Sequence, residues 1–259
     1  MKKSYASILI TNYNKRYFIK NTIKSCINQN FQKKEILVFD DCSSDGSLDV
    51  LNDFKQNITL IKNKKKKFTS GPLNQINGII QLFRKSKGEI IFLLDGDDFF
   101  KKNKISSIFK IFKENQDIDF LQDIPFLKNK KSFEKLKIKK HNFSIWPQFH
   151  PTSCISFRRK FFLDFLKFLK KDSFENLEID ARLSMFAFLK GRFKILNKSL
   201  TFYNFDKSGI SSRYKKFNTS WWKKRNEAFS YLLFLHKKMK LKFVYSMDFY
   251  LTKLINFFI

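Results

Sequence analysis

Residues 1–95 alternate between short apolar runs and segments with helical periodicity, and this alternation restricts the fold more than any other feature of the chain. Four apolar runs have the length of short buried strands: 7–11, 35–39, 58–61 and 89–94. Three segments between them have helical periodicity: 17–30, 47–54 and 73–87. Strands that alternate with helices predict an α/β domain with a mostly parallel central sheet flanked by helices.

Polar residues follow three of the predicted strands, at the point where each strand ends. Asn12 follows the first strand, Asp40 and Asp41 end the second, and Asp95 follows the fourth. In a parallel sheet these carboxyl ends lie at one edge, and ligands of such folds bind there. The sequence therefore predicts a polar binding site at this edge.

Acidic residues are clustered at two of these strand ends, in "FDDCSSDG" (39–46) and "LLDGDD" (93–98). Adjacent carboxylates repel one another and raise each other's pKa unless a cation is present. Mg²⁺ and Mn²⁺ prefer oxygen ligands, and Mg²⁺ is commonly held by one or two carboxylates together with substrate phosphates. The segment that contains Asp95, Asp97 and Asp98 is therefore a candidate metal–diphosphate site.

A structural role for the same acids is the alternative. Asp97 or Asp98 could cap a helix predicted over 99–113, and Asp45 could cap the helix at 47–54. Capping accounts for one acid in each cluster and leaves the others unexplained. The chain has 52 Lys and Arg against 23 Asp and Glu, a formal net charge of +29, so two acidic clusters at one edge indicate a function of their own.

The positive charge indicates an anionic partner, which could be a phosphorylated substrate, an anionic lipid or a nucleic acid. Cys26, Cys42 and Cys154 lack metal-ligand spacing, and their odd number argues against a disulfide framework, so we expect a reducing compartment. The first apolar run stops at Asn12, too early for a signal peptide, and no run reaches the ~20 apolar residues that cross a bilayer. We expect a cytoplasmic protein, or one bound peripherally at the inner face of the cell membrane.

Four stretches together resemble the family 2 glycosyltransferases, which have the GT-A fold. In chain order they are "SILITNYNKRYFIKNTIKSCINQNF", "EILVFDDCSSDGSLDVL", "GPLNQINGIIQLFRKSKGEIIFLLDGDD" and "LEIDARLSMFAFLKGRFKILNKSLTFYNFDKSGISS". The first three stretches together are a specific signal. The resemblance implies a Rossmann-like GT-A domain at 1–213, with a nucleotide-sugar-binding half (1–100) and an acceptor half (101–213). A basic, aromatic, helical tail would follow at 214–259.

The resemblance also implies roles for the residues at the sheet edge. A nucleotide-diphospho-sugar donor, usually UDP-linked in this family, would be bound by Thr11, Tyr13, Asp40, Asp41, Asn77 and Asp95. Asp97, with Asp98, would hold Mn²⁺ or Mg²⁺. The metal would neutralise the charge that develops on the departing nucleoside diphosphate.

An inverting transfer needs a carboxylate that takes the proton from the acceptor hydroxyl as this group attacks the sugar. The acid pair of the family aligns with Leu177 and Glu178, which implies Glu178 as the catalytic base, with Asp180 as the alternative. If the segment is helical, residues two apart point to different faces, so we expect only one of them to reach the site. Glu178 could instead form a structural pair with Arg182, one helical turn away.

Several positions depart from the family pattern. Cys42 stands where the family usually has Gly, Ile76 where Arg or Lys is frequent, and Asp206 where the family usually has His. These departures leave open a degenerate relative that binds a nucleotide-sugar without turnover. The segment "HPTS" at 150–153 either contacts the sugar or acceptor, or is a turn that leads into a strand.

The C-terminal segment 229–259 mixes aromatic residues with Lys237, Lys238, Lys240 and Lys242, a composition typical of an interfacial amphipathic segment. It either lies on an anionic membrane surface or packs on the domain as an ordinary core helix.

Taken with the motifs, the resemblance implies an inverting, metal-dependent glycosyltransferase with a glycan or lipid-linked acceptor, in the synthesis of a surface polysaccharide or lipopolysaccharide. A basic nucleic-acid-binding protein is the remaining alternative. It leaves both acidic clusters unexplained because they would repel phosphates, so we expect no nucleic-acid partner.

Overall fold

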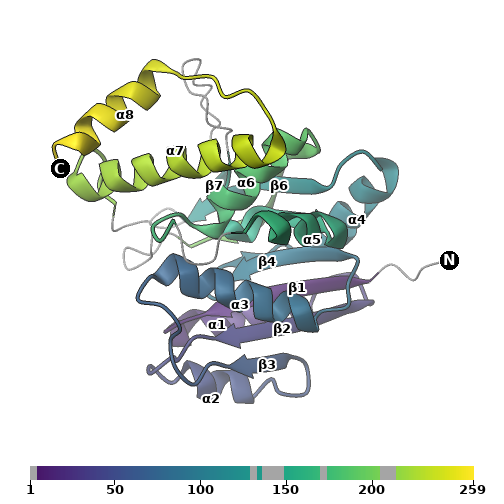
Figure 1. Cartoon of the computed structure of the whole chain (residues 1–259). Coiled ribbons are helices and arrows are strands. Elements are labelled where there is room, and N and C mark those ends of the chain that lie inside the picture. Colours follow the sequence, from purple (N-terminus) through teal and green to yellow (C-terminus); the bar gives the residue numbers. More distant parts are fainter. Residues whose placement is uncertain (1–4, 129–132, 136–148, 170–173, 205–213) are drawn as a thin grey trace.

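The computed structural model describes residues 5–128, 133–135, 149–169, 174–204 and 214–259. The strands of this part of the chain form one nine-stranded sheet in the order β3-β2-β1-β4-β8-β6-β9-β5, with β7 paired to β6. Helices cover both faces of the sheet (Figure 1). The predicted α/β fold, with a central sheet flanked by helices, is confirmed.

The first half of the chain builds the parallel part of the sheet. Its elements are β1 (Ala6–Asn12), α1 (Arg16–Ile27), β2 (Lys34–Asp40), α2 (Ser47–Asn52), β3 (Thr59–Lys62), α3 (Gly71–Lys85) and β4 (Ile90–Asp95). Strands β3, β2, β1 and β4 are parallel neighbours, as the alternation predicts. Helix α3 begins where the Ser70 side chain accepts a hydrogen bond from the Leu73 N–H (3.3 Å), with Pro72 in its first turn.

The second half makes the sheet mixed. Its elements are β5 (Phe99–Phe100), α4 (Lys104–Glu114), β6 (Phe120–Lys128), β7 (Phe133–Lys135), a 3₁₀ turn (Thr152–Cys154), β8 (Ile155–Arg158), α5 (Arg159–Phe168), α6 (Ile179–Lys190) and β9 (Phe193–Tyr203). Strand β8 runs antiparallel to both β4 and β6, whereas β9 runs parallel to β6. The turn before β8 shows that "HPTS" does lead into a strand.

The helix predicted over 99–113 is wrong at its start. Phe99 and Phe100 form β5, which pairs with β9, and the Phe99 ring stacks on Phe202 with centroids 4.7 Å apart. Aromatic residues favour strands when a partner is available across the ladder. Helix α4 begins only at Lys104, so neither Asp97 nor Asp98 caps it, and that structural explanation of the acids fails.

Two hydrophobic clusters cover the two faces of the sheet because successive strand side chains point to opposite sides. Leu9 of β1 belongs to a cluster built with α3, α5, α6 and α7, whereas Ile8 and Ile10 belong to one built with α1 and α4. Gly78 allows α3 to approach β2 closely, since a Cβ at this position would lie 2.5 Å from the Phe39 ring. This packing fixes the sheet edge at which the polar residues meet.

Two helices follow the sheet: α7 (Thr219–Met239) and α8 (Met247–Phe257). Phe229, Tyr231, Leu232 and Leu235 of α7 are buried, and α7 packs on the domain as the core-helix interpretation expects. Helix α8 lies beyond α7, at the top of Figure 1. The helical C-terminal extension is therefore confirmed, while its separation from the domain at residue 213 stays a prediction. Among the described helices, none is both long enough and apolar enough to cross a membrane.

Candidate active site

The carboxyl ends of β1, β2 and β4 lie side by side at one edge of the sheet. In the parallel register, Asn12 of β1 is opposite Asp40 of β2, and Thr11 of β1 is opposite Asp95 of β4. The prediction that these strand ends bring their polar residues together is confirmed.

Asp40 is buried and holds the loop that follows β2. One of its carboxylate oxygens accepts hydrogen bonds from the Asn12 amide (2.8 Å) and the Ser43 hydroxyl (2.6 Å), and the other accepts from the Ser43 N–H (3.0 Å). Cys42 in this loop has φ = 61°, in the left-handed region where a non-glycine residue costs roughly 1–2 kcal/mol. The backbone therefore shows why Gly is usual at this position.

Asp45 closes the same loop. It accepts hydrogen bonds from the Arg16 N–H (2.9 Å) and from the N–H (2.9 Å) and hydroxyl (2.5 Å) of Ser47. Burial raises the pKa of Asp45, but these bonds outweigh it and hold the pKa below its usual range. Gly46 is the residue that precedes α2, and Asp45 binds the first turn of that helix from the position before it. Asp45 therefore has a structural role at the start of α2, although the N-cap itself is Gly46.

Tyr13 and Asp41 form the outer part of the edge. The Tyr13 side chain is 45% exposed, and the Lys66 ammonium lies 3.5 Å from the centroid of its ring. Asp41 accepts a hydrogen bond from the Asn63 amide (2.8 Å). An exposed aromatic ring offers a stacking surface to a planar ligand, and a fixed carboxylate beside it can accept hydrogen bonds from that ligand.

Asp95 ends β4 and is held from two sides. Its carboxylate accepts hydrogen bonds from the Thr11 hydroxyl (3.2 Å) and the Gln75 amide (2.8 Å), while its own N–H donates to the Ser153 hydroxyl (3.0 Å). Within the described residues, Gln75 rather than Asn77 is the side chain of α3 that binds this carboxylate. Asn77 is half-buried on the same helix, and its role in nucleotide binding stays a prediction.

Asp97 and Asp98 have different surroundings. Both oxygens of the buried Asp98 are engaged, one by the Ser153 hydroxyl (2.5 Å) and the other by the Asn204 N–H (2.7 Å). Asp97 forms an ion pair with Lys15 (2.7 Å). Asp98 therefore orders the acidic segment, and Asp97 is better placed to contact a ligand.

Two of these carboxylates, Asp95 and Asp98, bind a proton more tightly than an ordinary aspartate. Burial, followed by the charge of Asp97, raises the pKa of Asp95 to about 7. Burial and the charges of Asp97 and Asp95 raise the pKa of Asp98 well above its usual range. A divalent cation next to this segment would relieve the repulsion.

The described residues contain no group of three or more His, Cys, Asp or Glu side chains able to hold a metal by themselves. Mg²⁺ sites that also bind phosphates usually use only one or two protein carboxylates, because phosphate oxygens and water complete the coordination. Asp97 and its acidic neighbours fit such a site. They do not fit a metal site made of protein ligands alone.

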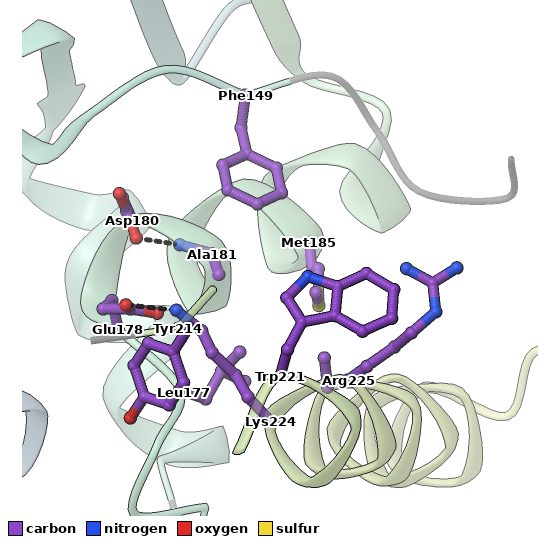
Figure 2. A pocket seen from close by; sticks show the side chains of 11 residues that line it. Phe149, Leu177, Glu178, Asp180, Ala181, Met185, Tyr214, Trp221, Lys224 and Arg225 are labelled. Atoms are coloured by element: carbon purple, nitrogen blue, oxygen red, sulfur yellow. Dashed lines mark hydrogen bonds and ion pairs between the residues drawn. The ribbon is translucent and has the colours of Figure 1, made fainter. Parts of the chain in front are cut away.

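A second acidic pair lines a cavity of about 450 Å³ between the start of α6 and helix α7. Figure 2 shows the carboxylates of Glu178 and Asp180 on one side of this cavity and the Trp221 indole on the other. The Lys224 ammonium forms an ion pair with Glu178, and Arg225 also lines the cavity.

The expectation that only one of the two acids reaches the site assumed a helical segment, and this condition is not met, since both acids line the cavity. Glu178 immediately precedes α6 with an extended backbone (ψ = 160°), so the helical rule for residues two apart does not apply to it. Asp180 lies in the first turn, and one of its oxygens accepts from the Ala181 N–H (2.7 Å). The Arg182 side chain donates to the carbonyls of Phe174 (2.5 Å) and Leu177 (3.0 Å), whereas Glu178 pairs with α7.

Electrostatic interactions connect the two acidic groups. Burial and the charge of Glu178 raise the pKa of Asp180 to about 7, and the more distant Asp95 adds to this rise. Tyr203, at the end of β9, has its pKa raised by burial and then by the charges of Asp98, Asp95, Asp180 and Asp97. Its hydroxyl therefore lies within range of both the sheet edge and the cavity.

Sequence reasoning missed five polar residues that the structure brings to these groups: Lys15, Gln75, Ser153, Tyr203 and Lys224. For Ser153, the sequence predicted only that it belongs to the "HPTS" segment. Its hydroxyl binds the Asp95 N–H and the Asp98 carboxylate, so this turn also holds the acidic segment in place. Asp206 lies outside the described residues.

Crystal structures of glycosyltransferases share this fold. Staphylococcus aureus TarS in complex with UDP-GlcNAc has a TM-score of 0.65 at 16% identity, over 88% of this chain and 66% of that chain. The mannosyltransferase PcManGT from Pyrobaculum calidifontis, in complex with GDP-Man and Mn²⁺, has a TM-score of 0.61 at 14% identity, over 99% and 70%. At such identities the similarity concerns the fold, and it confirms the GT-A class.

The family follows from the sequence itself. Residues 7–178 match the family described as Glycosyl transferase family 2, which is more than half of the chain. The chain belongs to this family, and the resemblance stated above is confirmed.

Curated relatives are similar over shorter stretches. The Escherichia coli UDP-Glc:alpha-D-GlcNAc-diphosphoundecaprenol beta-1,3-glucosyltransferase WfaP is 35% identical over 102 residues, 39% of this chain and 38% of that protein. A poly(ribitol-phosphate) beta-glucosyltransferase of Bacillus spizizenii is 34% identical over 115 residues, 42% of this chain and 17% of that protein. The chain therefore matches less than half the length of these two relatives.

Proposed function

We propose that this chain is an inverting glycosyltransferase that moves a sugar from a nucleotide-diphospho-sugar, UDP-linked, to a glycan or lipid-linked acceptor. The observation that carries the proposal is the concentration of Asp95, Asp97 and Asp98 at the end of β4, where burial and then the charge of Asp97 raise the pKa of Asp95. Two relatives support this substrate class. WfaP is named for a UDP-linked donor and a lipid-linked acceptor, and the Bacillus spizizenii enzyme is named for a poly(ribitol-phosphate) acceptor.

The donor would lie along the sheet edge. The residues proposed to bind its nucleotide are Thr11, Tyr13, Asp40, Asp41, Asn77 and Asp95. Among them, the exposed ring of Tyr13 offers a stacking surface for the base. Asp40 and Asp41 fix the loop beside it through their bonds to Ser43 and Asn63.

Asp97 would hold Mn²⁺ or Mg²⁺, and Asp98 would keep the segment in place through its bonds to Ser153 and Asn204. A metal bound there would offset the negative charge of the donor diphosphate. Lys15, which contacts Asp97, supplies a second positive charge near the same position.

Asp180 would act as the base, with Glu178 as the alternative that the family alignment favours. A base works best when its pKa lies near the working pH, and the raised pKa of Asp180 meets this condition. The carboxylate would take the proton of the acceptor hydroxyl while the oxygen of that hydroxyl forms a bond to the anomeric carbon. The bond from that carbon to the diphosphate breaks, and the nucleoside diphosphate leaves with the electron pair.

The cellular role proposed here is the synthesis of a surface polysaccharide or lipopolysaccharide, by a cytoplasmic protein that works at the inner face of the cell membrane. Membership of family 2 accounts for both acidic clusters. The nucleic-acid-binding alternative does not account for them and is not favoured.

Thermal unfolding with nucleotides tests the donor site. We expect UDP or a UDP-sugar to raise the melting temperature of the wild type more strongly with Mn²⁺, because a ligand that binds only the folded state stabilises it. Asp97→Asn should lose the Mn²⁺-dependent part. Asp49→Asn, which removes one charge from an exposed position on α2, should keep it.

Two results would contradict the proposal: no stabilisation of the wild type by any nucleoside diphosphate, or an unchanged Mn²⁺ effect in Asp97→Asn. Donor binding without transfer to any glycan or lipid-linked acceptor would instead identify the degenerate relative that the departures at Cys42 and Ile76 leave open.

A further inference from the structure

Helix α8 turns its polar side toward the protein. Asp248 forms an ion pair with Arg225 of α7, and Lys253 donates to the Asn226 side chain (2.7 Å). Asn256 donates to the carbonyl of Trp222 (3.0 Å). Helix α8 is thus attached to α7 by these polar contacts together with one buried aromatic residue, Phe249, whose ring centroid lies 5.3 Å from that of Phe229.

The apolar side of α8 faces outward. The α8 stripe, as we define it, consists of Met247, Tyr250, Leu251, Leu254, Phe257 and Phe258. Each of these side chains is at least 50% exposed, and Met247 and Phe257 reach 85% and 82%. Their spacing of three and four residues places them along one side of the helix. A contiguous exposed apolar surface of this kind marks an interaction site.

Exposed lysines precede the α8 stripe in the chain. Lys237 and Lys238 at the end of α7, and Lys240 and Lys242 in the connection to α8, are exposed. In Figure 1, α8 forms the outer border of the molecule, on the side of α7 away from β3. Four exposed lysines and the exposed apolar side chains thus belong to one stretch of chain, residues 237–258.

We propose that the α8 stripe inserts into the interfacial region of an anionic phospholipid bilayer, while the neighbouring lysines bind its headgroups. Apolar side chains beside a basic segment are the combination that anchors an interfacial helix. A second copy of this chain is a poorer occupant, because each copy has a net charge of +29 and would bring its own lysines against those of its partner.

Docking of α8 would also orient the candidate active site. Arg225 lines the cavity that contains Asp180, and the same side chain pairs with Asp248 of α8. A bilayer on the α8 stripe would hold this cavity near the membrane surface. This step rests on the proposed function and selects one substrate class within it: an acceptor anchored in the membrane by a lipid.

Vesicle flotation of the full chain tests the proposal. The vesicles contain phosphatidylcholine alone or mixed with phosphatidylglycerol. The stripe variant carries Met247→Gln, Leu251→Gln and Leu254→Gln. A matched control carries Tyr17→Gln, Leu163→Gln and Phe188→Gln, which are also at least 50% exposed but lie on other helices.

We expect the wild type and the control to float with anionic vesicles, and the stripe variant to bind at least about tenfold more weakly. Replacing Lys237, Lys238, Lys240 and Lys242 by Gln should weaken binding to anionic vesicles by roughly fivefold per lysine. The same change should have little effect on the weaker binding to neutral vesicles.

Two outcomes would overturn the proposal. One is equal flotation of the wild type and the stripe variant. The other is failure of the wild type to bind vesicles. If the wild type then sediments as a dimer and the stripe variant does not, the α8 stripe is an interface between two copies of the chain. Nucleotide-dependent thermal stabilisation of the stripe variant, measured in parallel, shows whether the donor site is intact, so failure of membrane docking and failure of the proposed function are distinguishable.

Discussion

Lys104 is a fully buried cation behind the acidic segment. Its ammonium donates hydrogen bonds to Asp123 (2.7 Å), to the Ser153 carbonyl (2.8 Å) and to the Thr201 hydroxyl (2.5 Å). The side chains of Lys104 and Asp123 are both 0% exposed. Because the Ser153 hydroxyl binds Asp98 and the N–H of Asp95, this ion pair supports the segment proposed to bind the donor.

Lys104→Met keeps most of the aliphatic volume and removes the charge, which leaves the Asp123 carboxylate buried without its cation. Removing one partner of a buried pair costs about 3–5 kcal/mol, and we expect the free energy of unfolding to fall by this amount. Lys110→Met is the matched control on the same helix. The Lys110–Glu114 pair is 3.9 Å long with side chains 76% and 56% exposed, so its loss should cost less than about 0.5 kcal/mol.

Urea unfolding at neutral pH, followed by circular dichroism, measures both changes. The double variant Lys104→Met/Asp123→Asn removes the stranded charge but keeps an acceptor for the Leu200 N–H, and should recover about 1–2 kcal/mol. A loss below about 1 kcal/mol in Lys104→Met, or no recovery in the double variant, would refute this reasoning.

Two predictions concern the cavity. Because burial and the charge of Glu178 raise the pKa of Asp180 to about 7, the folded state binds its proton more tightly than the unfolded chain does. The stabilisation from this group is complete below about pH 4 and is lost as the pH rises to about 7, so Asp180→Asn should flatten the decline of the melting temperature over this interval. The charge of Lys224 lowers the pKa of Asp180, so Lys224→Gln should move the acidic limb of the kcat/KM profile to higher pH. Lys224→Arg keeps the charge and should leave this limb in place. Equal profiles for both variants would contradict the assignment of Asp180 as the base.

The parallel half of the fold could be predicted because its signals are local. Each strand from β1 to β4 is a short, mostly apolar run, and each connecting helix has its own periodicity. Helix α3 also has a side-chain cap, Ser70, and a proline in its first turn. Strand β5 could not be predicted in this way. Phe99 and Phe100 form a strand only because β9, about a hundred residues later, offers Thr201 and Phe202 as partners.

The candidate site divides in the same way. Acids at strand ends were found because a single motif contains them, but their partners come from distant segments. The family resemblance implied Asn77 as a site residue of α3, whereas the structure shows Gln75 bound to Asp95. Which side chain of α3 points to the site depends on how that helix packs. Lys224 reaches Glu178 from a helix 46 positions later in the chain, and nothing local to either residue indicates the pair.

The two acidic pairs share one arrangement. In each pair one carboxylate contacts a lysine: Asp97 contacts Lys15, and Glu178 contacts Lys224. The other member, Asp95 or Asp180, is half-buried and has its pKa raised to about 7 by burial and by the charge of its neighbour.

Without a bound cation, this arrangement raises the pKa of Asp95 and Asp180 in a chain of net charge +29. The pKa of Asp98, the third acid of the first group, is raised as well. A lysine on both acids of a pair would cancel the repulsion that raises the second pKa. A lysine on neither would leave two uncompensated carboxylates at one position. Burial and Glu178 raise the pKa of Asp180, whereas Lys224 lowers it. The Lys224 variants therefore test whether Asp180 is the base that sets the acidic limb of the profile.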